Sequence, residues 1–148
     1  MSKPAHKIKA ATAIAPFVLR IEWANGRIND VNLSDTIKSV DFFAGLNDAD
    51  LFMQAHAGEW GWDVVWPGNV DMAADRLLIL ALEQSGKVEN ARFREWLSHN
   101  RLTLDEAAKA IGLTSRTINQ YGTGSRPVPR YITLACKGWE AERRDRHA

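Results

Sequence analysis

The chain has 148 residues, 45% of them hydrophobic and 25% charged, and its 19 Lys and Arg against 18 Asp and Glu give a formal net charge of +1. This composition is typical of one ordinary folded domain or two small ones, and the single cysteine, Cys136, excludes an internal disulfide framework. The longest apolar run, Leu77 to Leu82, is too short to span a bilayer, and the start lacks the apolar segment of a signal peptide, so we expect a cytoplasmic protein with no membrane partner.

A hairpin is predicted near the start of the chain. The leader Met1 to Ala15 contains Lys and Ala without an amphipathic pattern, so we expect it to be loosely held. Residues 17–23 have strand composition, and residues 27–33 alternate apolar with polar side chains. Asn25-Gly26 between them is a strong turn signal, because both residue types tolerate the positive φ of a tight hairpin. Two paired strands are predicted.

The next segments favour short helices or turns. Residues 34–40 and 48–55 are the two candidates, and Asn47 or Asp48 is placed to cap the second of them. On that second segment one face is formed by the apolar residues Leu51, Phe52 and Ala55.

An aromatic strand and a helix complete the N-terminal half. Residues 59–66, ended by Pro67-Gly68, favour a strand on which three tryptophans share one face: Trp60, Trp62 and Trp66. A helix over residues 72–83 follows, with four residues spaced for burial: Ala73, Leu77, Leu80 and Ala81. We expect the tryptophans to pack against this helix; an exposed face would instead be a partner or dimer surface, or a stacking site for flat rings. Residues 85–90 are a plausible polar linker.

The most specific pattern runs from Leu104 to Tyr121: Leu-Asp-Glu-Ala-Ala-Lys-Ala-Ile-Gly-Leu-Thr-Ser-Arg-Thr-Ile-Asn-Gln-Tyr. Apolar residues lie where two short helices that cross at a tight turn need to face a shared core: Ala107, Ile111, Leu113, Ile118 and Tyr121. Ala108 provides a small side chain at the closest approach of the helices, and Gly112 suits the left-handed residue that ends the first helix.

Both helix starts carry capping signals. Thr103 followed by Glu106 is a capping box, and Thr114 is a good N-cap for the second helix. With the size pattern, these caps predict a helix-turn-helix.

The region from about Ala91 to Trp139 resembles the lambda-repressor-like (Cro/repressor type) helix-turn-helix domain, including the loop Gly124-Ser-Arg-Pro-Val-Pro-Arg130 and the helix after it. Gly122 departs from the family, whose members usually carry an acidic or polar residue there, and we expect it to shorten the second helix by a turn. The resemblance implies binding to double-stranded DNA.

The N-terminal half is similar to the small α+β bacterial family catalogued as domain of unknown function 2442 (DUF2442). The residues that carry this resemblance are the hairpin ending in Asp30-Val-Asn-Leu33, the stretch Asn47-Asp-Ala-Asp-Leu-Phe52, and the aromatic strand closing on Trp66-Pro67 before an acidic helix start. Members are small cytoplasmic proteins, often encoded beside toxin-like partners and sometimes fused to this type of helix-turn-helix. The resemblance implies an architecture and a partner class, but no activity.

The predicted fold class is therefore α+β. A small N-terminal α+β domain over residues 16–84 is followed by an all-α helix-turn-helix domain over residues 91–140. The first domain is expected to dimerise, to bind a small-molecule effector or to hold a toxin-like protein.

In a helix-turn-helix the second helix enters the major groove N-terminus first, so its early side chains contact base edges. The candidates are Ser115, Arg116, Asn119 and Gln120. Arg116 can bond guanine through two acceptors, and Gln120 can do the same with adenine. The plainer alternative is that Arg116 is a solvated surface residue and that Asn119 and Gln120 form a polar helix face.

A second group of residues is predicted to contact phosphates, which positions the domain without recognising sequence. Its members are Thr103, Thr114, Thr117, Thr123, Ser125, Arg126 and Arg130. Thr103 and Thr114 can also act as helix caps and nothing more.

Charge is divided between the two halves. From Arg92 onward eleven Lys or Arg stand against six Asp or Glu, about +5, whereas the residues before it carry eight against twelve, about −4. The basic half suits phosphate binding, and the acidic half is expected to face away from a duplex.

Catalysis has little support in the sequence. The histidines are scattered without metal-ligand spacing: His6, His56, His99 and His147. The carboxylate pairs Asp48 with Asp50 and Asp71 with Asp75 are typical of helix starts, and Cys136 lies in an apolar helical stretch that indicates core packing. We therefore expect no enzyme, no metal and no cofactor.

Two hypotheses follow. The first is a sequence-specific double-stranded DNA-binding transcriptional regulator, with an antitoxin-like autorepressor as one form of it. We expect it to act as a homodimer, because one such domain buries too little surface for tight binding. The alternative is a protein-interaction adaptor whose helical unit packs on a partner rather than on DNA.

Overall fold

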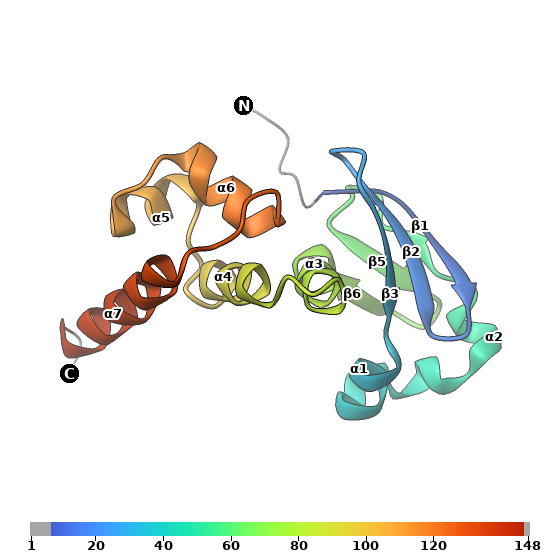
Figure 1. Cartoon of the computed structure of the whole chain (residues 1–148). Helices are drawn as coiled ribbons and strands as arrows, with labels where there is room; N and C mark the ends of the chain where they lie inside the picture. The colour runs from blue at the N-terminus through green and yellow to red at the C-terminus, as the bar shows by residue number, and fades with distance from the viewer. Residues whose placement is uncertain (1–6, 147–148) are drawn as a thin grey trace. The chain divides into compact units, whose positions relative to one another are not determined.

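The computed structural model describes residues 7–146, and the chain divides into two compact units between Gln84 and Ser85 (Figure 1). The first unit contains two three-stranded antiparallel sheets with helices, and the second is entirely helical within its described residues. The predicted α+β fold class is therefore confirmed.

The first sheet has the order β1 (Ile8–Ala15), β2 (Val18–Trp23), β3 (Ile28–Asn32). The predicted hairpin is β2–β3, which turns at Gly26 with a φ of 88°. The expectation of a loose leader is wrong for residues 8–15, because β1 pairs along β2 and the Ile8 N–H donates to the Gly61 carbonyl at 2.7 Å. Residues 1–6 of that leader lie outside the described part of the chain.

Short helices connect the two sheets. They are α1 (Ser34–Ser39), the 3-10 helix η1 (Asp41–Asn47) and α2 (Ala49–Phe52). The Asp48 side chain caps α2 by accepting from the backbone N–H groups of Asp50 and Leu51, which confirms one of the two predicted caps.

The second sheet has the order β4 (His56–Ala57), β5 (Asp63–Trp66), β6 (Val70–Ala73). The predicted strand over residues 59–66 is wrong in its first half, because Gly61 adopts a φ of 78° in a turn closed by its N–H to the Gly58 carbonyl. This turn breaks the alternation of strand side chains. Trp66 is buried, but Trp60 and Trp62 are 70% and 45% exposed and do not share its face.

The helix predicted from residue 72 begins two residues later, as α3 (Ala74–Gln84). Met72 and Ala73 belong to β6 instead, so Ala73 is exposed and was wrongly placed in the helical core. Leu77 and Ala81 are buried as predicted, and Leu80 is half-buried.

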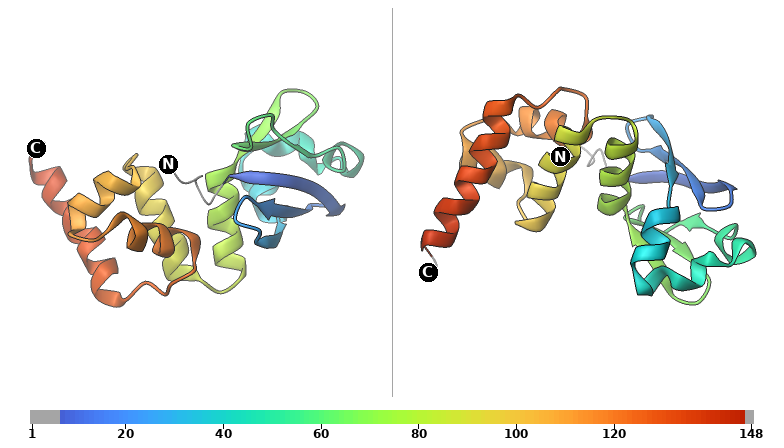
Figure 2. Two further views of the ribbon diagram at one scale, coloured as in Figure 1. Left: turned by 90° about the horizontal axis from the view of Figure 1, so that it is seen from above. Right: turned by 60° about the horizontal axis from the view of Figure 1, so that its bottom comes forward.

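The second unit contains α4 (Val88–His99), α5 (Leu104–Ile111), α6 (Ser115–Thr123) and α7 (Arg130–Arg146). Helix α4 packs against α6 and α7, and α5 packs against the same two helices (Figure 2). The linker predicted over residues 85–90 ends early, because α4 starts at Val88 and Asn90 is only 5% exposed. The buried core contains Phe93, Trp96, Leu97, Ala107, Ala108, Ile118, Tyr121, Val128, Ile132 and Cys136.

Within residues 7–146, no helix combines the length and the apolar character that crossing a membrane requires.

Candidate functional site

The two helices α5 and α6 are joined by a tight turn, and their starts are fixed by local caps. The Thr103 hydroxyl accepts from the Glu106 N–H at 3.1 Å while the Glu106 carboxylate accepts from the Thr103 N–H at 3.0 Å, which is the predicted capping box. Thr114 caps α6 by accepting from the Thr117 N–H at 3.2 Å. Gly112 ends α5 with a φ of 73°, a conformation that glycine adopts with little strain.

The apolar pattern of these helices forms the expected shared core. Ala107 and Ile118 are fully buried, and Tyr121 is 2% exposed. Ile111 and Leu113 are half-buried and pack against the same cluster. The position of α6 is thereby fixed by burial along one face.

The opposite side of α6 carries most of the predicted base-contacting residues. Arg116 is exposed, and Asn119 and Gln120 are half-buried. Their side chains make no hydrogen bond or ion pair within residues 7–146, so they remain available to an external partner. Ser115 differs, because its hydroxyl donates to the Asp105 carboxylate at 2.5 Å.

The expectation that Gly122 shortens the second helix is wrong. Helix α6 continues to Thr123 and ends at Gly124, which has a φ of 81°. Gly122 is buried against α4, and a Cβ added there would lie 2.9 Å from the Arg94 guanidinium and 3.3 Å from Leu97. The glycine therefore creates space for a buried arginine without ending the helix.

Three side chains from α4 and its N-cap bind carbonyl groups at the end of α6 and in the following loop. The Asn90 amide donates to the Tyr121 and Arg126 carbonyls at 2.9 and 2.8 Å, and the Arg94 guanidinium donates to the Gly122 carbonyl at 3.0 Å. The Lys87 ammonium donates to the Gly124 carbonyl at 2.9 Å. We call Lys87, Asn90 and Arg94 the carbonyl clamp.

The carbonyl clamp satisfies backbone acceptors that a helix end otherwise leaves without partners, and it brings positive charge to the negative end of the helix dipole. The sequence pattern places Asn90 in a predicted linker and indicates no role for Arg94. The spacing of polar residues at 87, 90 and 94, one face of a helix, was the available signal.

The loop after α6 presents three of the predicted phosphate-contacting residues. Ser125, Arg126 and Arg130 are exposed, and the Arg126 guanidinium lies 5.7 Å from the centroid of the Tyr121 ring. Thr123 is 7% exposed and its hydroxyl donates to the Asn119 carbonyl at 2.9 Å, which leaves it unsuited to the predicted phosphate contact.

The other predicted threonines lie at helix starts. Thr103 and Thr114 are exposed, and Thr117 is half-buried with its hydroxyl 2.9 Å from that of Thr114. A hydroxyl has two acceptor lone pairs, so Thr103 and Thr114 retain acceptor capacity beside their capping bonds.

Metal-binding clusters are not found in the described part of the chain, where no group of three or more His, Cys, Asp or Glu is placed to hold an ion. His6 and His147 lie outside the described residues. Cys136 is buried as expected, and this burial raises the pKa of its thiol to about 12, so the thiolate nucleophile is scarce at neutral pH.

Comparison with solved structures relates most of this chain to another protein. The crystal structure of the putative DNA binding protein NE0471 from Nitrosomonas europaea matches with a TM-score of 0.65 and 35% sequence identity, over 93% of this chain and 88% of that chain. The chain belongs to the same family as NE0471.

The similarity to NE0471 extends over both units, because so little of either chain is left unmatched. No family model matches the sequence, and no curated protein matches it either.

The carbonyl clamp predicts a large stability effect from one amide. Replacing Asn90 by Ala leaves two carbonyls without their donor, so we expect the free energy of unfolding of the second unit to fall by about 2 kcal/mol, despite better helix propensity. Urea unfolding followed through the NMR signals of α6 measures this change in the free energy of unfolding. Ser98→Ala, an exposed change on the same helix, is the control and should alter stability by less than about 0.5 kcal/mol. Equal effects would contradict the role assigned to Asn90.

The capping box predicts a specific acid sensitivity. Hydrogen bonding from the Thr103 backbone N–H, and then from its hydroxyl, lowers the pKa of Glu106. A carboxylate with a lowered folded-state pKa stabilises the fold above its unfolded pKa of about 4.3 and loses that contribution as the pH falls through the folded value. We expect the stability difference between the unchanged protein and Glu106→Gln to be largest at neutral pH and to shrink below about pH 4. A difference that does not vary with pH would contradict this role of the charge.

Proposed function

We propose that the second unit binds double-stranded DNA by inserting α6 into the major groove. The observation that carries the proposal is the face of α6 on which the side chains of Arg116, Asn119 and Gln120 have no hydrogen-bond partner within residues 7–146. The opposite face is locked into the core by Ile118 and Tyr121. A rigid helix with free polar side chains at its start is the arrangement that recognises base edges.

We assign this unit to the lambda-repressor-like helix-turn-helix type. Its support is the combination of a capping box, a left-handed Gly112 and the small Ala108 at the crossing of α5 and α6. The name of NE0471 as a putative DNA binding protein gives independent support, because that protein is 35% identical over nearly the whole chain.

Arg116 and Gln120 are the proposed specificity residues. The exposed Arg116 guanidinium suits the two acceptors of guanine, and the Gln120 amide suits adenine. Asn119 is a further candidate. Ser115 is at the same helix start, but its bond to Asp105 must be exchanged before the hydroxyl meets a base.

Phosphate contacts are proposed on both flanks of α6. One flank consists of the helix starts with Thr103, Thr114 and Thr117, and the other is the loop with Ser125, Arg126 and Arg130. Helix N-termini and arginines are common phosphate ligands because they supply N–H groups and positive charge. Burial removes Thr123 from this proposed set.

We further propose that the protein is a cytoplasmic transcriptional regulator that binds a two-fold operator as a homodimer. A single unit of this size buries too little surface on DNA for tight specific binding, and a dimer doubles the buried surface. The first unit, which resembles the DUF2442 family, is assigned to dimerisation, to a small-molecule effector or to a toxin-like partner, as in an antitoxin that represses its own synthesis. Its exposed Trp60 and Trp62 supply a suitable contact surface.

An adaptor function is the second candidate. Helix α7 exposes Tyr131 and Leu134, 67% and 50% accessible, which is apolar surface suited to a protein partner. An adaptor would not be retained on duplex DNA even at low salt, whereas the proposed regulator binds DNA strongly there and weakens as salt rises.

Arg116 provides the sharpest test of base recognition. We expect Arg116→Ala to leave thermal stability nearly unchanged, since the side chain is exposed and unpaired, but to remove about 1–3 kcal/mol of discrimination between preferred and other sequences. Selection of bound sequences from a random duplex pool, followed by fluorescence anisotropy, measures this loss. Arg144→Ala is the matched control, because it removes the same charge from an exposed position on α7. Unaltered preference in Arg116→Ala would refute the recognition role.

Arg126 tests the phosphate contacts separately. We expect Arg126→Ala to weaken binding to all duplexes alike and to reduce the slope of log affinity against log salt by about 1, because one fewer phosphate is neutralised. Titrations of a selected and a scrambled duplex at several salt concentrations give both quantities. A slope equal to that of the unchanged protein would place Arg126 outside the interface.

A further inference from the structure

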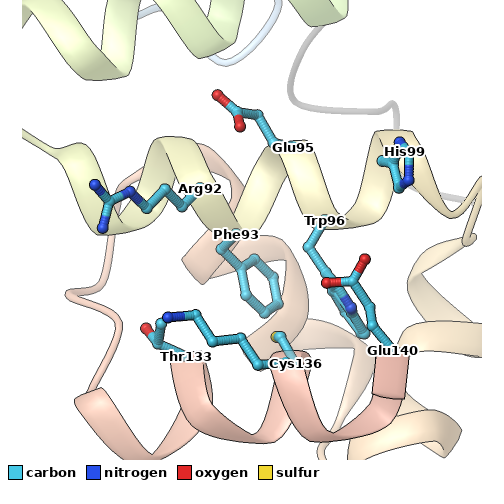
Figure 3. Close-up of a pocket in the computed structure, with 9 residues that line it drawn as sticks. Arg92, Phe93, Glu95, Trp96, His99, Thr133, Cys136 and Glu140 are labelled. Carbon is cyan, nitrogen blue, oxygen red and sulfur yellow. The ribbon is translucent and has the colours of Figure 1, made fainter. Parts of the chain in front are cut away.

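A pocket of about 250 Å³ lies between α4 and α7 within the second unit (Figure 3). Its apolar walls are Phe93 and Trp96, and Figure 3 shows both side chains extending from α4 towards α7, with Cys136 between them. The proposed DNA contacts on α6 do not involve this pocket. Its size suits a ligand with a single ring, and its walls favour a flat apolar body.

The indole of Trp96 has an unmet hydrogen-bonding requirement. Trp96 is only 5% exposed, and its Nε1–H has no hydrogen-bond partner in residues 7–146. A buried donor without an acceptor destabilises the fold, and most buried polar groups in folded proteins do find a partner. Trp96 and Glu140 both line the pocket, and Figure 3 shows their side chains overlapping in this view. The nitrogen is also closed to solvent, so an occupant with an acceptor oxygen would satisfy this donor after a neighbouring side chain shifts.

The charges around the pocket balance. Two cations, Arg92 and Lys137, line it together with two carboxylates, Glu95 and Glu140. The Arg92 guanidinium is also paired with the Glu89 carboxylate at 3.2 Å. A net negative or positive ligand would meet as much repulsion as attraction. The pocket is therefore matched to a molecule without net charge.

We propose that this pocket is a binding site for a small, uncharged aromatic molecule that carries a carbonyl acceptor, such as an aromatic amide. The ring packs against Phe93 and Trp96, and the carbonyl oxygen accepts from the Trp96 Nε1–H. This places a small-molecule site in the second unit, whereas the sequence suggested an effector only in the first.

The site also has a physical connection to α6. The Phe93 ring meets the Tyr121 ring edge to face, with centroids 5.4 Å apart, so an occupant of the pocket touches a side chain that supports α6. Binding is therefore expected to perturb the amide signal of Tyr121 as well as the Trp96 indole.

Three molecules of the same shape test the proposed ligand site. The test uses no DNA, so a failure to bind ligand is distinguishable from a failure to bind DNA. Benzamide is neutral with a carbonyl acceptor, benzoate is an anion, and benzamidine is a cation without an acceptor. The probe is the indole Nε1–H signal of Trp96 in the full chain, assigned among the six tryptophans by its loss in Trp96→Phe. We expect benzamide to shift this signal saturably with a Kd of about 1 mM or tighter, and the two charged analogues to bind roughly tenfold more weakly.

A charge variant tests the balance of charges directly. Glu140→Gln keeps the shape of the side chain but leaves the pocket with one net positive charge, so we expect the preference to move from benzamide towards benzoate. Glu142→Gln is the matched control, because it makes the same change on α7 outside this pocket and should retain the preference for benzamide. The proposal is overturned if benzamide up to about 10 mM produces no saturable shift, if the three molecules bind equally, or if the control changes preference as Glu140→Gln does.

Discussion

The end of α6 is held by side chains of another helix, and the candidate interface depends on this constraint. Lys87, Asn90 and Arg94 donate to the carbonyls of Tyr121, Gly122, Gly124 and Arg126, which fixes the last turn of α6 and the start of the following loop. The loop then presents Ser125 and Arg126 at a defined place beside α6. Since the clamp binds backbone atoms, it leaves the outward side chains of α6 unengaged. One helix therefore serves as a scaffold for the orientation of another.

The starts of α5 and α6 could be predicted from sequence because their determinants are local. A capping box spans three residues, and Thr114 bonds an N–H only three positions away. The end of α6 could not be predicted in the same way, because the groups that stabilise it lie about 30 positions earlier in the chain. Gly122 was misinterpreted for this reason: its function depends on Arg94, which no local pattern reveals. The candidate base-contacting residues, by contrast, follow from the helix start; Arg116 is exposed, and Ser115, Asn119 and Gln120 are half-buried.

In the first unit, too, the elements set by local residues could be predicted from the sequence, and those set by distant contacts could not. The β2–β3 hairpin was predictable because Asn25-Gly26 encodes its own turn, and Asp48 encodes the start of α2. The strand β1 was missed because its Ala-rich sequence carries little strand propensity, and only pairing with β2 orders it. The tryptophans were misplaced because composition does not show where a strand begins. Gly61 turns the chain, so Trp60 and Trp62 face solvent while Trp66 donates its Nε1–H to the Phe52 carbonyl.

The pairing of β1 has a practical consequence for work with shortened forms of this protein. The sequence alone suggests trimming the chain to start at Pro16, yet that cut would uncover one whole side of β2, with its row of peptide N–H and C=O groups. An open sheet edge invites pairing with a second molecule, so a protein trimmed there would be prone to aggregate. It would also lose Ile8, whose backbone ties this sheet to the turn at Gly61.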